Sequence, residues 1–592
     1  MTTLKEYCTM FIQSLQQFAI ATEKKISSPR TLFWLSLSLT FSIIYSLLAL
    51  NQAFNGDYIV QDDARKHIFW MGRFIHPELF LNDLIADFFQ SVEPIGLKIV
   101  YRFFTRFNLD PMVVNKCLPL GLGVLMTYYC FGICFQLFPV PIAAFITATL
   151  FNQSIWMKDI FVAAIASSFS YPLFLGFLYY LLKRYYLGML IFLILEGLFY
   201  PPCVLLSAAI IFVKFIHYKN DKISLVSNSR ERKCYLLGLV VSAILLLTYL
   251  VNSSEFGPII GKAEALRLPE FYSEGRASFF NNNSIQYWLL GIRSGMLPRG
   301  ILTPVTLSLG LLFPILLLFP QQFPLTQKIK SSIIFIPQLL IISISLFFTA
   351  HLLLFRLFLP NRYTSHSFYL IIAIMAGITI TILIDSLLNV SQLPKQSLFS
   401  SIFALLIVGL LGFTVIFYPS FLNKFTSPNY IQPKESALYD FLLQQPKNSQ
   451  IASLSEAADN IPSFAKLPVL TAWEYAIPYQ RNYYYQIRQR TLDLIQAQYS
   501  LSLQPMNDLI EQYDVDFILL DSQAFTLNYF QKNSWLKQWK NIKIVGKIRN
   551  NLIQGKLPAL TFHIKNCSVY HSDQFIVLNS NCIQNNFIQS NN

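Results

Sequence analysis

The chain contains 592 residues, of which 54% are hydrophobic and only 13% are charged. A soluble globular domain carries about 25% charged residues, so this composition excludes an ordinary soluble enzyme and indicates a large lipid-facing surface. The net charge of +14 comes from basic residues scattered through the loops, without a basic stripe or a nucleic-acid motif. We therefore expect membrane spans flanked by Lys and Arg, and neither a nucleic-acid nor a nucleotide partner.

Residues 1–31 form a separate N-terminal segment. Leu4, Tyr7, Phe11, Leu15 and Phe18 recur at helical spacing, which predicts an amphipathic arm on the cytoplasmic face of the membrane. The segment is too long and too mixed in character for a cleavable leader. We expect the first span to act as an uncleaved anchor.

Residues 32–420 form the predicted transmembrane domain, which is all-α and polytopic. A span needs about 20 mostly apolar residues, and eleven segments are candidates. They are 32–50, 117–137, 139–155, 160–182, 186–197, 200–217, 234–251, 301–320, 332–354, 367–388 and 399–419. Tyr200-Pro201-Pro202 breaks the apolar stretch 186–217 and predicts two spans there. A single span would give ten helices and place the C-terminal domain in the cytoplasm.

The distribution of basic residues distinguishes these two topologies. With eleven spans and a cytoplasmic N-terminus, the basic loop 214–233, Lys183-Arg184 and Lys328 with Lys330 all lie in the cytoplasm, as the excess of Lys and Arg in cytoplasmic loops requires. The long segments 51–116 and 252–300 then lie outside. We therefore expect eleven spans in the plasma membrane and an extracytoplasmic C-terminal domain.

The first outer loop, 51–116, is predicted to contain two flat interfacial helices. Residues 62–75 place apolar side chains on one face and charged ones on the other, which predicts one amphipathic helix. Residues 79–90 continue with a second one, whose polar face carries Asp83 and Asp87. We expect this second polar face to be solvated.

Residues 421–592 are predicted to form an extracytoplasmic α/β domain. The expected helices are 434–444, 491–500 and 506–513, and the expected strands are 450–454 and 515–520. Cys567 and Cys582 bracket strand-like residues and could form a disulfide in an oxidising compartment. The sequence leaves that pairing open, because it does not position the two Cβ atoms.

The strongest candidate site lies just beyond the first span, in the stretch GDYIVQDDARKH at residues 56–67. This stretch resembles the GT-C superfamily, the polyprenyl-phosphate-dependent membrane glycosyltransferases, in which an acidic residue or pair follows the first span and flat helices come next. Asp62 and Asp63 match that acidic pair. Asp159, in Trp156-Met157-Lys158-Asp159, is placed to match a further acidic residue of the second outer loop.

The resemblance implies a GT-C-like fold and a polyprenyl-phosphate-linked sugar donor in the membrane. Asp62, Asp63 and Asp159 would be the catalytic residues, or the ligands of a divalent cation if one is used. A carboxylate at the membrane surface can serve as the base that the acceptor needs. Two Asp residues before a helix are also typical N-terminal caps, so a purely structural role stays open.

Binding of the lipid phosphate needs further polar side chains at the same depth. The candidates in the first outer loop are Asp57, Arg65, Lys66, His67 and Arg73, and those in the outer loop 356–366 are Arg356, Arg362 and Tyr363. An interfacial Arg can instead extend to the membrane surface without binding a ligand. Both interpretations of these Arg residues stay open.

These observations favour a glycosyltransferase of the hexosyltransferase type, acting on an extracytoplasmic lipid, glycan or protein. The alternatives are a transporter or flippase for lipids or glycans, and a catalytically inactive GT-C relative. Ion-coupled transporters place charged residues near the middle of the membrane. The predicted spans hold almost none, which favours a site at the membrane surface.

Overall fold

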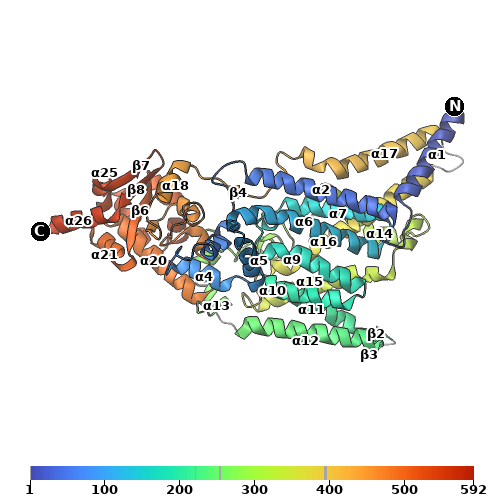
Figure 1. Ribbon diagram of the computed structural model, residues 1–592, viewed down its shortest axis with the longest axis horizontal. Coiled ribbons are helices and arrows are strands. Elements are labelled where there is room, and N and C mark those ends of the chain that lie inside the picture. Colours follow the sequence, from blue (N-terminus) through green and yellow to red (C-terminus); the bar gives the residue numbers. More distant parts are fainter. Residues whose placement is uncertain (1, 220–221, 252–254, 392–396, 592) are drawn as a thin grey trace.

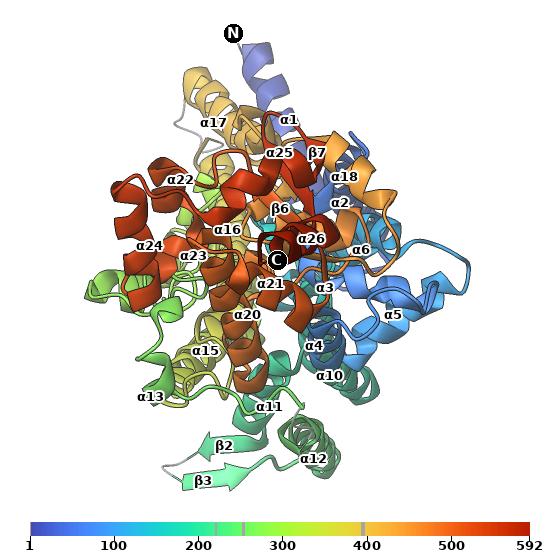
Figure 2. The ribbon, with the colours of Figure 1, turned by 90° about the vertical axis from the view of Figure 1, so that its left-hand side faces the viewer.

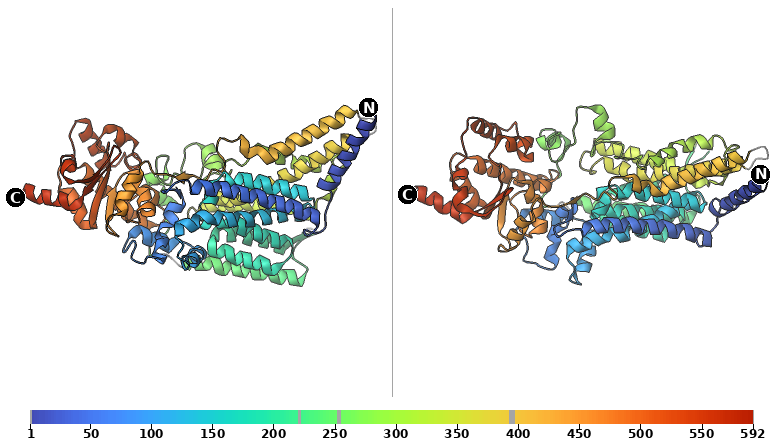
Figure 3. Two further views of the ribbon diagram at one scale, coloured as in Figure 1. Left: turned by 45° about the horizontal axis from the view of Figure 1, so that its top comes forward. Right: turned by 90° about the horizontal axis from the view of Figure 1, so that it is seen from above.

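The computed structural model describes residues 2–219, 222–251, 255–391 and 397–591. The molecule is elongated, with a helical bundle and a mixed α/β domain at one end of it (Figure 1). The N-terminus lies at the opposite end, as the further views in Figure 3 also show. We call the end of the bundle that carries the C-terminal domain the domain end, and the other the far end.

Eleven helical segments form the bundle within the described residues. They are α2 (Pro29–Ala53), α6 (Pro111–Leu137), α7 (Pro141–Trp156), α9 (Ala166–Leu182), α10 (Tyr186–Phe199), α11 (Pro201–Phe215), α12 (Ser229–Val251), η4 (Val305–Leu312) continuing into α14 (Phe313–Leu317), α15 (Phe335–Leu352), α16 (Asn361–Ser391) and α17 (Leu398–Phe417). Six of them, α2, α6, α12, α15, α16 and α17, are long and apolar enough to cross a membrane, and shorter apolar helices accompany them. The chain is therefore an integral membrane protein, and the predicted all-α polytopic domain is confirmed.

The apolar stretch 186–217 forms two antiparallel helices rather than one. Tyr200 ends α10, and Pro201 begins α11. Ser207 of α11 donates a hydrogen bond of 2.7 Å to the buried carboxylate of Glu196 in α10, so the two helices lie side by side. The prediction of two helices here is confirmed, and the proline pair breaks the chain for the reason expected.

Helix α16 lies at the centre of the bundle, whereas α12 and α17 expose most of their surface. Gly377 of α16 permits a close approach to α7: a Cβ at this position would lie 2.0 Å from the hydroxyl oxygen of Thr147. Small residues at such crossings allow helix backbones to pack tightly in membranes. This close packing fixes α16 against α7, and the first turn of α16, at Asn361, lies at the domain end of the bundle.

Residues 51–116, the predicted first outer loop, contain three short helices and one longer one. The strand β1 (Val60–Gln61) precedes α3 (Ala64–His67), η1 (Phe69–Phe74), α4 (Leu84–Val92) and α5 (Ile95–Thr105). The predicted single helix over 62–75 is wrong, because Arg65 and Lys66 turn into the protein and are buried. The expected solvation of Asp83 is also wrong: this carboxylate is 4% exposed and caps α4 by accepting from the Ala86 amide at 2.8 Å.

The C-terminal domain is built around a four-stranded sheet in the order β5-β6-β8-β7. Strands β5 (Gln450–Ser453) and β6 (Val515–Asp521) are parallel, and β8 (Phe575–Asn579) is antiparallel to both β6 and β7 (Ser568–His571). Its longer helices are α18 (Ser436–Leu443), α20 (Arg481–Tyr499), α21 (Gln504–Tyr513), α24 (Lys543–Ile553) and α26 (Ser580–Asn591). The predicted α/β character is confirmed, since β5, β6, α18 and α21 match the expected elements closely.

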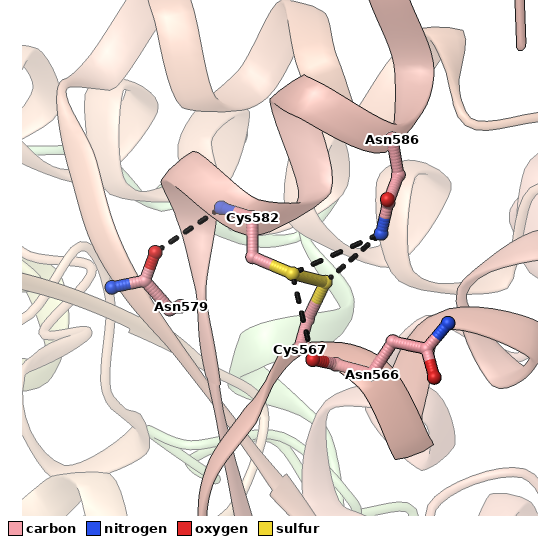
Figure 4. Close-up of a disulfide and its surroundings, with 5 residues drawn as sticks. All are labelled: Asn566, Cys567, Asn579, Cys582 and Asn586. Carbon is pink, nitrogen blue, oxygen red and sulfur yellow. Dashed lines mark hydrogen bonds between the residues drawn. A yellow bond between two sulfur atoms is a disulfide. The ribbon is translucent and has the colours of Figure 1, made fainter. Parts of the chain in front are cut away.

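Shorter elements complete the chain. They are α1 (Thr2–Ala19), α8 (Asp159–Val162), β2 (Ile216–Lys219), β3 (Lys222–Leu225), α13 (Lys262–Ala265), η2 (Pro269–Phe271), η3 (Gln286–Leu290), η5 (Pro324–Lys328), η6 (Ser331–Ile334), η7 (Tyr418–Phe421), β4 (Tyr430–Ile431), η8 (Glu456–Asn460), α19 (Ile461–Phe464), η9 (Trp473–Tyr475), α22 (Leu527–Lys532), α23 (Ser534–Gln538), η10 (Ala559–His563) and α25 (Ile564–Cys567). Cys567 and Cys582 are joined by a disulfide that links the end of α25 to α26 (Figure 4).

Candidate functional site

The acidic pair Asp62-Asp63 follows directly on β1, which the linker to the C-terminal domain holds in place. Strand β1 pairs antiparallel with β4, so that Gln61 lies opposite Tyr430. The side-chain oxygen of Gln61 accepts hydrogen bonds from the amides of Asp63 (2.7 Å) and Ala64 (2.9 Å). Gln61 therefore caps the start of α3, and the Asp63 side chain makes no capping hydrogen bond. The capping interpretation of the acidic pair is contradicted.

Each carboxylate of the pair instead binds a cation one turn further along the chain. A guanidinium nitrogen of Arg65 lies 2.7 Å from Asp62, and the ammonium of Lys66 lies 2.7 Å from Asp63. Both cations are almost completely buried, whereas the two carboxylates keep about a quarter of their side-chain surface exposed. The acidic pair is thus the accessible edge of a buried ionic network.

This network extends into the C-terminal domain through Glu474, which lies in η9. The carboxylate of Glu474 lies 3.0 Å from Lys66, 3.7 Å from Arg65 and 2.6 Å from Arg276 of the segment between α12 and η4. The Asp459 carboxylate accepts from the Glu474 amide at 2.8 Å. Three segments far apart in the sequence therefore meet around one carboxylate.

Glu474, Asp459 and Arg276 were not predicted as site residues from the sequence. Glu474 stands between Trp473 and Tyr475. These two large aromatic neighbours are the only local sign in the sequence that the carboxylate is buried. Arg276 stands in a loop without any distinguishing pattern. Only the tertiary structure brings these side chains to the acidic pair.

The two carboxylates of the pair differ in electrostatic environment. Burial and the nearby charge of Glu474 raise the pKa of Asp62 above its usual range. Burial also acts to raise the pKa of Asp63, but the ammonium of Lys66 outweighs it and holds that pKa below the usual range. Asp62 is therefore the more basic of the two carboxylates, and Asp63 is the one that stays ionised.

A second group of polar side chains lies at the start of α16, and it contains Arg362 and His366. The positive charge of Arg362 reaches the acidic pair, since it contributes to lowering the pKa of Asp63. His366, one turn further along α16, lies between the rings of Tyr171 and Tyr200, with centroid distances of 5.1 and 5.5 Å. We call Arg362, His366 and Tyr200 the α16 cluster.

The α16 cluster has buried polar atoms without partners in the described part of the chain. They are Nε of Arg362, both ring nitrogens of His366 and the hydroxyl of Tyr200. Arg362 also forms no ion pair among the described residues. Buried polar groups in native proteins are normally hydrogen-bonded, so these atoms are suited to hold a polar ligand.

Asp159 also lies close to the acidic pair. The Gln61 side-chain amide donates to the Asp159 carbonyl at 3.4 Å, and the Asp159 carboxylate is exposed. The structure therefore brings Asp62, Asp63, Arg65, Lys66, Asp159 and Arg362 together at the domain end of the bundle.

The other predicted site residues have separate surroundings. His67 binds the buried Glu93, and Arg73 lies 2.7 Å from Asp87, so both brace the first outer loop. Asp57 and Arg356 are exposed and form no ion pair within the ranges that the structure describes. The hydroxyl of Tyr363 donates to the Leu357 carbonyl at 2.7 Å, which leaves this buried residue turned toward its own loop.

A divalent cation does not fit the acidic pair as it is arranged here. The oxygens of Asp62 and Asp63 are directed at Arg65 and Lys66. In addition, no group of three or more His, Cys, Asp or Glu residues within the described ranges is placed to hold a metal ion. We therefore derive no step through a metal at this site.

Comparisons with known proteins bear on the fold. No protein-family model matches the sequence, and no curated protein matches it. The chain is similar to solved structures of an oligosaccharyltransferase from Archaeoglobus fulgidus. One of these structures is the enzyme tethered to an acceptor peptide that contains the NVT sequon. Its TM-score with this chain is 0.50 at 14% identity, and the match covers 88% of this chain and 72% of that chain.

Two further structures of the archaeal enzyme match over similar lengths. The complex with an inhibitory peptide and a dolichol-phosphate gives a TM-score of 0.49 at 14% identity, covering 87% of this chain and 72% of that chain. The apo form gives 0.48 at 13% identity, covering 87% and 73%. The similarity to the peptide-tethered form shows that this chain shares the fold of that archaeal oligosaccharyltransferase.

Proposed function

We propose that the chain is a membrane glycosyltransferase that moves a sugar from a polyprenyl-phosphate-linked donor to an extracytoplasmic lipid, glycan or protein. One observation carries this proposal. An accessible carboxylate pair and a partly buried cation, which has no ion-pair partner among the described residues, lie together at the domain end of a GT-C bundle. A fold alone does not define an activity; the chemistry of these side chains does.

Asp62 is the proposed general base. In the reaction, the acceptor hydroxyl or amine forms a bond to the anomeric carbon of the sugar and gives its proton to Asp62. The bond from that carbon to the phosphate oxygen breaks, and the lipid phosphate leaves with the electron pair. The raised pKa of Asp62 makes it the stronger base of the pair, and Asp63 stays ionised beside Lys66.

The α16 cluster is the proposed binding site for the lipid phosphate. Arg362 presents a guanidinium, which binds phosphate oxygens in a bidentate manner. The ring nitrogens of His366 and the Tyr200 hydroxyl add hydrogen-bonding groups beside it. Charge that develops on the leaving phosphate would be stabilised there, and preorganised electrostatic stabilisation of this kind is usually the largest catalytic contribution.

We place the domain end outside the cytoplasm and the N-terminus inside, in the plasma membrane. The disulfide Cys567–Cys582 supports this orientation, because disulfides persist in oxidising compartments. Far-end contacts support it as well: the Lys330 amide donates to the Leu137 carbonyl at 3.0 Å, which puts the basic segment before α15 beside the end of α6. Lys and Arg accumulate on the cytoplasmic side of membrane proteins.

A transfer assay tests this function. Purified protein in nanodiscs is incubated with a panel of radiolabelled polyprenyl-phosphate sugars and a membrane extract as acceptor. We expect label in a new product with the unmodified protein and about 100-fold less or lower with Asp62→Asn/Asp63→Asn. Donor binding without transfer by the unmodified protein would favour the inactive relative, and no binding across the panel would favour the transporter.

A further inference from the structure

A cavity lined mostly by residues of the first outer loop lies apart from the candidate active site. It has a volume of about 620 Å³, and its lining includes Trp70, Arg73, Phe74, Lys98 and Arg102. It shares no lining residue with the acidic pair or the α16 cluster. The function proposed above makes no use of it.

Helix α5 forms one wall of this cavity. One of its faces packs on the protein, and the other exposes apolar side chains. Its buried face packs on the end of α10, where a Cβ on Gly96 would lie 2.6 Å from the Phe199 ring. The opposite face exposes Ile95, Ile99 and Phe103 by more than half of their surface. These three residues recur at intervals of four and therefore form one stripe along the helix.

The position of this stripe indicates what covers it. Helix α5 lies at the level where α10 ends, and the end-on view in Figure 2 places it at the periphery of the molecule, beside α4 and α6. An exposed apolar stripe at the end of a membrane bundle, flanked by cations, is typical of a helix lying in the membrane interface. Lipid acyl chains are the apolar partner available there.

Two cations beside the stripe have no carboxylate partner in the described part of the chain. The Lys98 ammonium donates to the Gln90 carbonyl at 3.1 Å, and the Arg102 guanidinium lies 5.5 Å from the centre of the Phe74 ring. The two carboxylates in the lining are Asp87, which Arg73 neutralises at 2.7 Å, and Glu255. The lining therefore keeps a net positive charge of one.

A second hollow of about 640 Å³ continues this cavity toward α20. The two share Asp87 and Glu255, and the second adds Asn482, Tyr485 and Gln486 among its lining residues. Amide and phenol groups suit the hydroxyl groups of a polyol. The surface thus runs from an apolar stripe, past two cations, to a polar hollow.

We propose that this surface binds an anionic glycerophospholipid of the surrounding membrane. Its acyl chain lies along Ile95, Ile99 and Phe103, its phosphate binds Lys98 and Arg102, and its polyol headgroup extends toward Asn482 and Gln486. Basic side chains at the membrane surface attract anionic lipids in this way. The bound lipid would anchor the first outer loop, which carries the acidic pair, to the bilayer.

Native mass spectrometry of the full-length protein in detergent tests this assignment, with equal amounts of phosphatidylglycerol and phosphatidylcholine as probes. We expect the unmodified protein to retain more phosphatidylglycerol than phosphatidylcholine. In Lys98→Gln/Arg102→Gln, the ratio of the two retained lipids should fall about fivefold for each cation removed. Arg106→Gln is the matched control, because Arg106 is an exposed cation directly after the same helix and does not line the cavity. It should keep the preference within about twofold.

Two results would overturn the assignment. The first is equal retention of the two lipids by the unmodified protein, or a preference that the double variant keeps. The second is complete displacement of phosphatidylglycerol by an equal amount of polyprenyl phosphate, with the displacement abolished in the double variant. That outcome would assign the surface to the polyprenyl lipid instead. Melting temperatures measured without lipid check that the variants are folded. We expect them to be unchanged, because the replaced side chains are partly exposed.

Discussion

Replacing Glu474 by Gln removes the carboxylate on which three segments of the chain converge. Arg65 and Lys66 keep Asp62 and Asp63 as partners, whereas Arg276 loses the only carboxylate that it contacts within the described residues. Removing one partner from a buried ion pair costs about 3–5 kcal/mol. Because two of the three cations stay paired, we expect about 3 kcal/mol, at the lower end of that range.

Urea unfolding followed by tryptophan fluorescence measures this loss, since Trp473, Trp535 and Trp539 lie in the C-terminal domain. The matched control is Glu274→Gln. Glu274 also bridges to the C-terminal domain, through Lys540 at 2.5 Å, but that pair is 46% and 59% exposed, compared with 16% for Glu474. An exposed pair contributes about 0–1 kcal/mol, so the control should change the free energy of unfolding little.

The pH dependence of this difference provides a second check. The neighbouring cations, led by Lys66, lower the pKa of Glu474 against the opposing effect of burial. A carboxylate with a lowered folded-state pKa stabilises the protein above its unfolded-state pKa and loses that effect as the pH falls. The difference in stability between the unmodified protein and the Glu474→Gln variant should therefore shrink below about pH 4. If Glu474→Gln and Glu274→Gln lower the free energy of unfolding by the same small amount at neutral pH, Glu474 does not stabilise the meeting of the three segments.

Three further outcomes follow from individual groups. Burial raises the pKa of Asp83 to about 6. The free energy of unfolding should therefore fall by about 3 kcal/mol in total as the pH rises from about 4 to 6 and Asp83 ionises. Urea unfolding of Asp83→Asn, a variant that keeps the helix cap, should lack this decline. Cys582→Ser opens the bridge to Cys567 across 15 residues and should lower stability by about 3 kcal/mol in thermal unfolding, whereas no change would mean that the bridge is dispensable. If Asp62 is the base, Glu474→Gln should move the acidic limb of the pH–rate profile to lower pH, because Glu474 raises the pKa of Asp62; an unmoved limb would assign the base elsewhere.

Local patterns in the sequence were sufficient to predict much of the architecture. Apolar runs identified the bundle helices, the proline pair after Tyr200 separated α10 from α11, and a helical segment followed by a buried apolar run over 506–520 identified α21 and β6. Each of these depends on residues close together in the chain. The paired acids after the first span were likewise visible as a motif.

The surroundings of the acidic pair could not be predicted in the same way. Glu474 and Arg276 reach Lys66 and each other only through long-range packing of the C-terminal domain and a loop. The amphipathic pattern over 62–75 suggested one helix, but burial of Arg65 and Lys66 on the ionic network breaks it after His67. Sequence periodicity assumes that charged residues face water, and that assumption fails at a buried ionic site.

The most direct test of the account measures donor binding and sugar transfer separately, with the same radiolabelled polyprenyl-phosphate sugar in nanodiscs. We expect Asp62→Asn/Asp63→Asn to bind the donor but to transfer about 100-fold less sugar or worse. Arg362→Gln should bind the donor poorly, whereas Arg356→Gln, which changes an exposed residue, should behave as the unmodified protein. Transfer at an undiminished rate by the double Asp variant would contradict the central claim that this carboxylate pair performs the chemistry.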